Sequence, residues 1–173
     1  MYEFFVSYSR HDADIARAIA EALSQLGVPA WMAESQILIE GRKAKTDEDR
    51  LRELLADAAA KSRRCLLLAS QAALESIYVM RDEVAPFRER EATEEQQLVW
   101  PLIVGEGGEN ARDGWPQEWR GRTPLQCRDE NDAERLVREV CRDAGVAIAS
   151  EDTRIRQASA KTVKVVRKIS SVR

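Results

Sequence analysis

Residues 2–8 read YEFFVSY, a short run of aromatic and β-branched residues close to the start of the chain. This composition predicts a buried β-strand. The stretch that follows, residues 13–27, reads ADIARAIAEALSQLG, and its apolar residues recur at steps of three and four, which predicts an amphipathic helix. Asp12 is suited to its N-cap, and Gly27 to the position just after its end. The chain therefore opens with a strand and a helix.

The same alternation continues along the chain. The run CLLLA at 65–69 is continuously apolar, as expected of a central strand covered on both faces. Alternating strands and helices predict an α/β domain with a parallel sheet and helices on both faces. The other predicted strands are 28–32, 98–104 and a weak edge strand at 125–127, and the other predicted helices are 47–61, 77–95 and 132–144.

Composition excludes several classes of protein. With 173 residues, 44% of them hydrophobic, the chain is long enough for one domain and a short extension. Its three cysteines, Cys65, Cys127 and Cys141, form no CxxC pair, so we expect neither a disulfide framework nor a metal site. A reducing cytoplasm is the expected location. The sequence holds no apolar run of about 18 residues and no secretory signal, so we expect no membrane association.

Charge divides the chain at about residue 147. Residues 148–173 hold seven basic and two acidic residues, whereas the whole chain has a net charge of −3, so residues 1–147 are strongly acidic. An acidic body argues against nucleic-acid binding. The division predicts a domain at 1–147 and a basic helical tail or linker at 148–173, which would self-associate, dock on the body or join another domain. The apolar seam of that helix is expected at Ile155, Ala158, Thr162, Val165, Ile169 and Val172.

The loops after the strands lack the motifs of several familiar chemistries. There is no glycine-rich phosphate loop, which argues against a Rossmann or P-loop nucleotide site. No aspartate ends the first or third strand, as a phospho-acceptor domain requires. His11 is the only histidine, and no GxSxG motif accompanies it, so a Ser-His-Asp triad is not expected.

What the chain does contain resembles the Toll/interleukin-1 receptor (TIR) domain family, of the bacterial type. The resemblance covers about residues 1–145, and its motifs occur in the order that the family has them. They are YEFFVSYS at 2–9 followed by Asp12, GVPAW at 27–31, Gly41, SRRCLLLAS at 62–70, SIYV at 76–79 followed by Glu83, and WPLIV at 100–104. The sequence departs from the family at Glu40, where a proline is usual, and at Tyr78, where many members have tryptophan. The aspartate that usually follows the second-strand tryptophan is also absent.

The resemblance implies a flavodoxin-like, three-layer fold with a five-stranded parallel sheet in the order 2-1-3-4-5. It also implies one of two functions: cleavage of the nicotinamide–ribose bond of NAD on self-assembly, or binding of other TIR domains without catalysis. Both belong to signalling or defence. In the enzymes a glutamate after the third strand acts, and Glu83 is its match, although adjacent Asp82 leaves the choice of carboxylate open. The residues expected to bind NAD are Tyr8, Ser9, Arg10, Trp31, Ser70 and Tyr78.

The chemistry needs few groups. When nicotinamide leaves NAD it departs neutral, so no general acid is required, and one carboxylate beside the ribose stabilises the developing positive charge. NAD is then a substrate, and no cofactor is expected. A loop at about 34–45 is expected to assemble with a neighbouring copy, together with the C-terminal helix, and its Arg42, Lys43 and Lys45 to offer charge to the diphosphate. A third, weaker alternative is an enzyme similar to nucleoside deoxyribosyltransferases.

Overall fold

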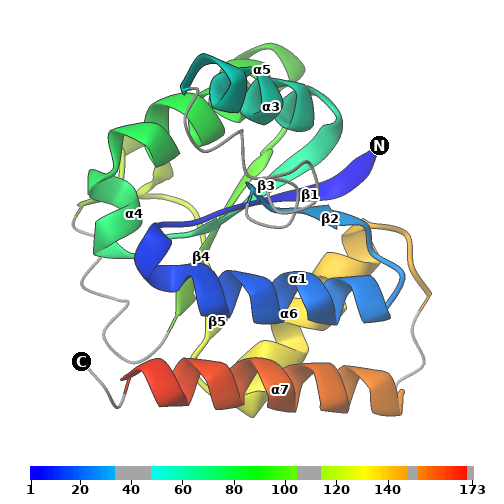
Figure 1. Ribbon diagram of the computed structural model, residues 1–173. Helices are drawn as coiled ribbons and strands as arrows, with labels where there is room; N and C mark the ends of the chain where they lie inside the picture. Colours follow the sequence, from blue (N-terminus) through cyan, green and yellow to red (C-terminus); the bar gives the residue numbers. More distant parts are fainter. Residues whose placement is uncertain (34–47, 105–113, 148–151, 171–173) are drawn as a thin grey trace.

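The computed structural model describes residues 1–33, 48–104, 114–147 and 152–170. Its five strands pair in parallel in the order β2-β1-β3-β4-β5, and helices cover both faces of the sheet (Figure 1). The predicted α/β fold and strand order are confirmed. The strands are β1 Tyr2–Ser7, β2 Ala30–Trp31, β3 Ser62–Leu68, β4 Val99–Val104 and β5 Leu125–Cys127.

Two hydrophobic cores lie on the two faces of this sheet. Successive residues of β1 alternate between them, because side chains of a strand project to opposite faces: Phe4 and Val6 join one core, and Phe5 the other. The first core is completed by α1 (Ala13–Gln25) and α6 (Glu130–Asp143), and the second by α3 (Glu48–Ala60), α4 (Gln71–Glu75) and α5 (Ala85–Glu94). The apolar side chains on both faces of the sheet are thereby buried.

The first helix begins and ends where the sequence predicts. Asp12 occupies the N-cap position of α1, although its side chain makes no capping hydrogen bond. Gly27 follows the C-cap residue Leu26 with a φ of +78°, a left-handed conformation that glycine adopts without strain. The chain can therefore turn at once from α1 toward β2.

The segment after β3 differs from the single helix predicted at 77–95. A short helix, α4, comes first, and Tyr78–Val84 then forms a π-helix, η3, that continues directly into α5. Pro86 lies in the first turn of α5 and has no amide hydrogen to give the carbonyl four residues before it, so the regular ladder is interrupted there. The Ala85 amide donates instead to the carbonyl of Met80, five residues back. Hydrophobic periodicity carries no signal for such a change.

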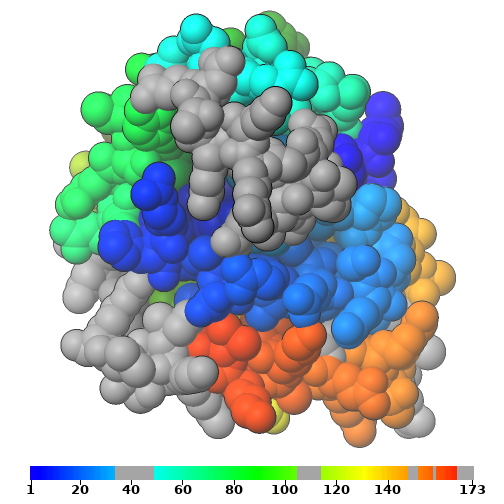
Figure 2. Space-filling model, in the orientation of Figure 1, coloured from blue at the N-terminus to red at the C-terminus, as the bar shows by residue number. Residues whose placement is uncertain are grey.

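The tail forms an 18-residue helix, α7 (Thr153–Ser170), that lies alongside α1 in Figure 2 and packs against α1 and α6. The predicted seam covers only part of the buried face. Ile155 and Thr162 are buried as expected, Val165 is partly buried against the same core, and Val163 and Val166 are buried in addition. A helix that packs on two helices buries a broader face than a heptad seam does. No helix in the described part of the chain, α7 included, is both long and apolar enough to cross a bilayer.

Candidate functional site

The turns after β1 and β3 meet at the carboxyl edge of the sheet through a buried carboxylate. The hydroxyls of Ser9 and Ser70 both donate to Oδ2 of Asp12, each at 2.6 Å. Ser70 also begins α4, since its hydroxyl oxygen accepts the Ala73 amide at 3.1 Å. Asp12 and Ser9 are 4% and 5% exposed, and Ser70 is partly buried. This hydrogen-bonded cluster fixes the two turns relative to each other.

Glu83 lies at the same edge, on the π-helix η3. Its Oε2 accepts a hydrogen bond of 2.6 Å from the hydroxyl of Ser7, the last residue of β1, and its carboxylate also accepts the Tyr8 amide. Burial raises the pKa of Glu83 to about 7, against the opposing effect of these two hydrogen bonds, and the charge of Asp82 raises it further. Near neutral pH the side chain is therefore divided between its ionised and protonated forms.

Asp82 has different surroundings although it is the next residue. The Arg81 guanidinium donates to its two oxygens at 2.7 and 2.9 Å, and Arg52 of α3 lies 3.8 Å away. The hydrogen bonds from Arg81 hold the pKa of Asp82 below its ordinary value. Of the two adjacent carboxylates, Glu83 contacts the end of β1, and Asp82 is bound to arginines.

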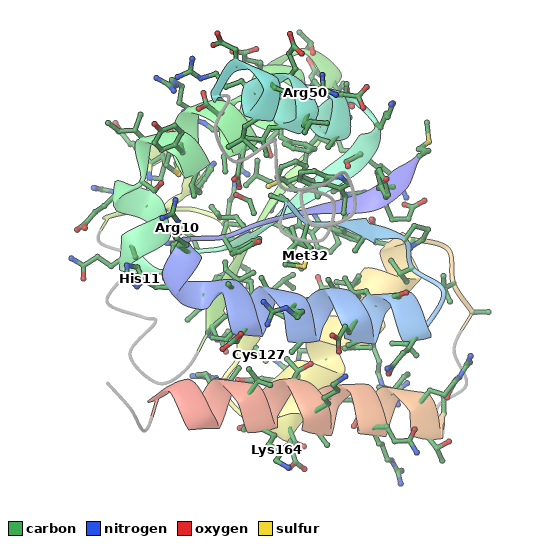
Figure 3. All side chains as sticks on the ribbon, viewed as in Figure 1. Arg10, His11, Met32, Arg50, Cys127 and Lys164 are labelled. Carbon is green, nitrogen blue, oxygen red and sulfur yellow. The ribbon has the colours of Figure 1, made fainter. Side chains whose placement is uncertain are left out.

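Three other predicted site residues lie around this edge. Tyr8 reaches Glu83 through its backbone amide. Arg10 is exposed on the short helix η1 (Arg10–Asp12), in the turn between β1 and α1 that Figure 3 shows next to α4. Tyr78 begins η3 with half of its surface exposed, and the Arg81 guanidinium lies 5.9 Å from its ring centre. Each of the three belongs to β1, to the turn after it or to the helix that carries Glu83.

Trp31 lies in the core, at the end of β2. Its ring stacks on Phe5 with a centroid separation of 4.7 Å and an interplanar angle of 27°, and 6% of the residue is exposed. The next residue, Met32, lies on the other side, between β2 and α1 (Figure 3). Stacking of Trp31 on a base or a nicotinamide stays a prediction. The expected 34–45 loop, with Arg42, Lys43 and Lys45, lies outside the described residues.

The clefts found on the described part of the chain lie away from this edge. Two of them, of about 410 and 510 Å³, adjoin the turn at Gly121 and the side of α6, near the amino ends of β4 and β5. Neither is lined by a predicted site residue. Ligands of open α/β sheets bind beyond the carboxyl ends of the strands, so the edge that carries Glu83 is the better candidate site.

Sequence reasoning missed two residues of this edge. Ser7 and Asp12 belong to the first-strand motif, and Asp12 was also predicted to cap the helix, but neither was expected to make contacts at the site. A serine inside an otherwise buried strand carried a signal, because a buried hydroxyl needs a hydrogen-bond partner. Its partner is 76 residues away along the chain, so the sequence could not name it.

Comparison with known proteins agrees with this fold. The family profile described as "TIR domain" matches residues 4–141, and the chain belongs to the TIR domain family. No curated protein matches the chain. Among solved structures it is similar to the TIR domain of the Toll-related receptor TRR-2 from Hydra magnipapillata, with a TM-score of 0.56 and 14% identity, covering 83% of this chain and 98% of that one. It is also similar to the TIR domains of the activated Roq1 resistosome that recognises the effector XopQ, with a TM-score of 0.45 and 12% identity, covering 96% of this chain and 84% of that one.

Proposed function

We propose that this TIR domain cleaves the bond between nicotinamide and ribose in NAD, and that Glu83 is the carboxylate that acts. The observation that carries the proposal is the 2.6 Å contact between Glu83 and Ser7 at the end of β1. A carboxylate at the carboxyl edge of the sheet, with a raised pKa and no arginine or lysine partner among the described residues, is typical of a functional site. Its π-helix adds to this, because π-turns are frequent at functional sites.

The reaction asks one thing of Glu83. As the C1′–N1 bond breaks, its electron pair leaves with nicotinamide and positive charge develops on the ribose. An ionised Glu83 stabilises that charge more strongly in a water-poor site than in bulk water. In hydrolysis, water then attacks C1′ and loses a proton. In cyclisation, a nitrogen of the adenine in the same NAD molecule attacks C1′ instead, and the adenine loses a proton. The ionised form is the active one, so the rate should fall as pH drops through the pKa of about 7.

We further propose that the active form is an assembly of several copies, in signalling or defence. The binding surfaces would be the 34–45 loop and the C-terminal helix. If assembly completes the site, nicotinamide release should rise more steeply than in proportion to protein concentration. A release rate proportional to concentration across the range would count against assembly.

The second candidate is an interaction module that binds other TIR domains without catalysis. It is favoured by two neighbouring apolar side chains that are exposed close to Glu83, Ile77 at 68% and Tyr78 at 50%. Such side chains are suited to a contact with another protein.

The test compares two carboxamide variants, Glu83→Gln and Asp82→Asn, with the unchanged protein. Nicotinamide released from NAD by concentrated protein is measured by chromatography, and assembly by light scattering. Loss of an electrostatic stabiliser should lower the rate of Glu83→Gln about 100-fold or more. Retention of the full rate by Glu83→Gln would overturn the role of Glu83. Absence of release from the unchanged protein, with assembly intact, would select the interaction module.

A further inference from the structure

Ser7 is a polar residue in a position where the strand pattern is apolar. It is the last residue of β1, pairs in register with Leu67 of the central strand β3, and is 0% exposed. A buried hydroxyl that makes no hydrogen bond is destabilising, so its partner is expected to matter. That partner is Oε2 of Glu83, at 2.6 Å.

Charged side chains surround η3 on the elements that pack against it, and most of them form ion pairs or hydrogen bonds with residues other than Glu83. On η3 itself, Asp82 is bound to Arg81, and Arg52 of α3 is directed to the same Asp82. On α4, Glu75 is exposed and accepts from Gln71 at 2.8 Å. On α5, Arg88 pairs with Glu118, Arg90 with Glu94 and Glu91 with Arg122. Glu89 of α5 is exposed, and β3 contributes Cys65.

Cys65 brings no charge to Glu83. Burial raises the pKa of its thiol well above the ordinary value, and the charges of Glu83 and Glu91 raise it further, so it stays neutral. Among the described residues, the groups that favour the ionised form of Glu83 are therefore the Ser7 hydroxyl and the Tyr8 amide. The amide belongs to the backbone and is present whatever residue stands at position 8. The hydroxyl depends on the residue at position 7.

We infer that Ser7 is a positioning residue that holds the Glu83 carboxylate ionised against the end of β1. The consequence for catalysis rests on the proposed function, but the effect on Glu83 itself does not. The hydroxyl donates to the ionised carboxylate. When Glu83 is protonated, its carboxyl O–H can donate a hydrogen bond to the same oxygen atom of Ser7. One side chain thus keeps Glu83 in place in both states.

Removing the hydroxyl should raise the pH at which Glu83 titrates. A hydrogen bond to a charged group corresponds to a shift of about one to two pH units. Because Glu83 of the unchanged protein titrates at about 7, Ser7→Ala should leave a small ionised fraction at pH 7. Nicotinamide release at pH 7 should then fall about 5- to 50-fold and recover as the pH is raised.

The experiment is a ¹³C NMR titration of the Glu83 side-chain carboxyl in the full chain, without NAD. Ser7→Ala should shift the titration upward by about one to two units, and Ser7→Thr, which keeps the hydroxyl, should restore it. Ser9→Ala is the matched control, because Ser9 lies at the same edge and donates to Asp12 instead. Thermal unfolding followed by circular dichroism checks that each variant is folded.

A Glu83 titration unchanged by Ser7→Ala would overturn the inference. So would an equal shift in Ser9→Ala, because the effect would then not depend on the contact with Glu83. If the titration shifts as expected but no variant releases nicotinamide, the proposed function fails and the role of Ser7 stands. If release requires Glu83 but its pH profile is the same in Ser7→Ala, the inference alone fails.

Discussion

Glu83 and Glu91 are two glutamates on consecutive helical segments, and their surroundings shift their pKa values in opposite directions. Both are partly buried, and both carboxylates accept backbone amides from the end of a strand: Glu83 from Tyr8 after β1, and Glu91 from Leu98 and Val99 at the start of β4, at 2.7 and 2.8 Å. Glu91 also receives two hydrogen bonds from the Arg122 guanidinium, at 2.9 and 2.8 Å. Glu83 receives the hydroxyl of Ser7.

The pKa values follow from this difference. Burial alone would raise the pKa of Glu91, but the hydrogen bonds from Arg122 and from the two amides outweigh it and lower the pKa below its ordinary value. At Glu83 burial prevails, and the pKa rises to about 7. A carboxylate that ties α5 to β4 and to the turn at Arg122 is given a counter-charge. Glu83, at the carboxyl edge of the sheet, has no counter-charge among the described residues, which costs stability and suits chemistry.

The largest effect on stability is expected from Glu91→Gln. It leaves the partly buried Arg122 guanidinium without its carboxylate, and loss of one partner of a buried ion pair costs about 3–5 kcal/mol. Urea unfolding at pH 7 measures the free energy of unfolding. Glu94→Gln is the control, since its exposed pair with Arg90 contributes at most about 1 kcal/mol. Equal costs for the two variants would show that Glu91 is not the structural tie described here.

Glu83→Gln should change stability in the opposite direction and in a pH-dependent way. Its pKa of about 7 in the folded state lies above the ordinary value of 4.5 that it has in the unfolded chain. The stabilising contribution of protonated Glu83 is present in full below pH 4.5 and is lost as pH rises through 7. Glutamine has no charge to bury, so the variant should be about 2–3 kcal/mol more stable than the unchanged protein at pH 8.

Urea unfolding of both proteins at pH 4.5, 6 and 8 tests this. Taking the difference between the two proteins at each pH removes the contribution of every other titrating group. The advantage of Glu83→Gln should disappear at pH 4.5 and grow through the window between 4.5 and 7. A difference that is the same at the three pH values would mean that Glu83 titrates in the folded protein as it does in the unfolded chain.

The contrast between the two glutamates also marks what sequence reasoning can reach. The strands and helices followed from local patterns: the apolar run at 65–69 predicted a central strand, and β5 was predicted with the residues it has. The parallel sheet predicted that the site lies at the carboxyl ends of the strands, and the family resemblance indicated Glu83 as its acting residue. None of this distinguishes Glu83 from Glu91 in charge state, because that depends on Ser7 and Arg122, which are distant in sequence.

Other misses have the same cause. The π-helix depends on how the ladder adjusts around Pro86 under the packing of α3 and β1, which periodicity does not describe. The buried face of α7 is broader than the predicted seam because the helix packs on two partners, α1 and α6, which the apolar pattern alone could not identify. In each case the missing information is a tertiary contact, and local propensity yields to it.

The smallest effect is expected from Asp82→Asn. This variant tests whether the raised pKa and the activity depend on Glu83 alone or on the two adjacent acids together. Asp82 is bound by Arg81, and its negative charge raises the pKa of Glu83. The variant should therefore lower the pH at which Glu83 titrates by less than about one unit and raise nicotinamide release slightly at pH 6, where more Glu83 becomes ionised. The stability change should stay within about 1 kcal/mol, because the Arg81 side chain is 55% exposed and solvent screens the pair. The ¹³C titration of Glu83 and the release rate at pH 6 measure both effects. If Asp82→Asn abolished release while Glu83→Gln did not, the acting carboxylate would be the one that the arginines hold, and an unpaired acid at the edge of the sheet would no longer explain the chemistry.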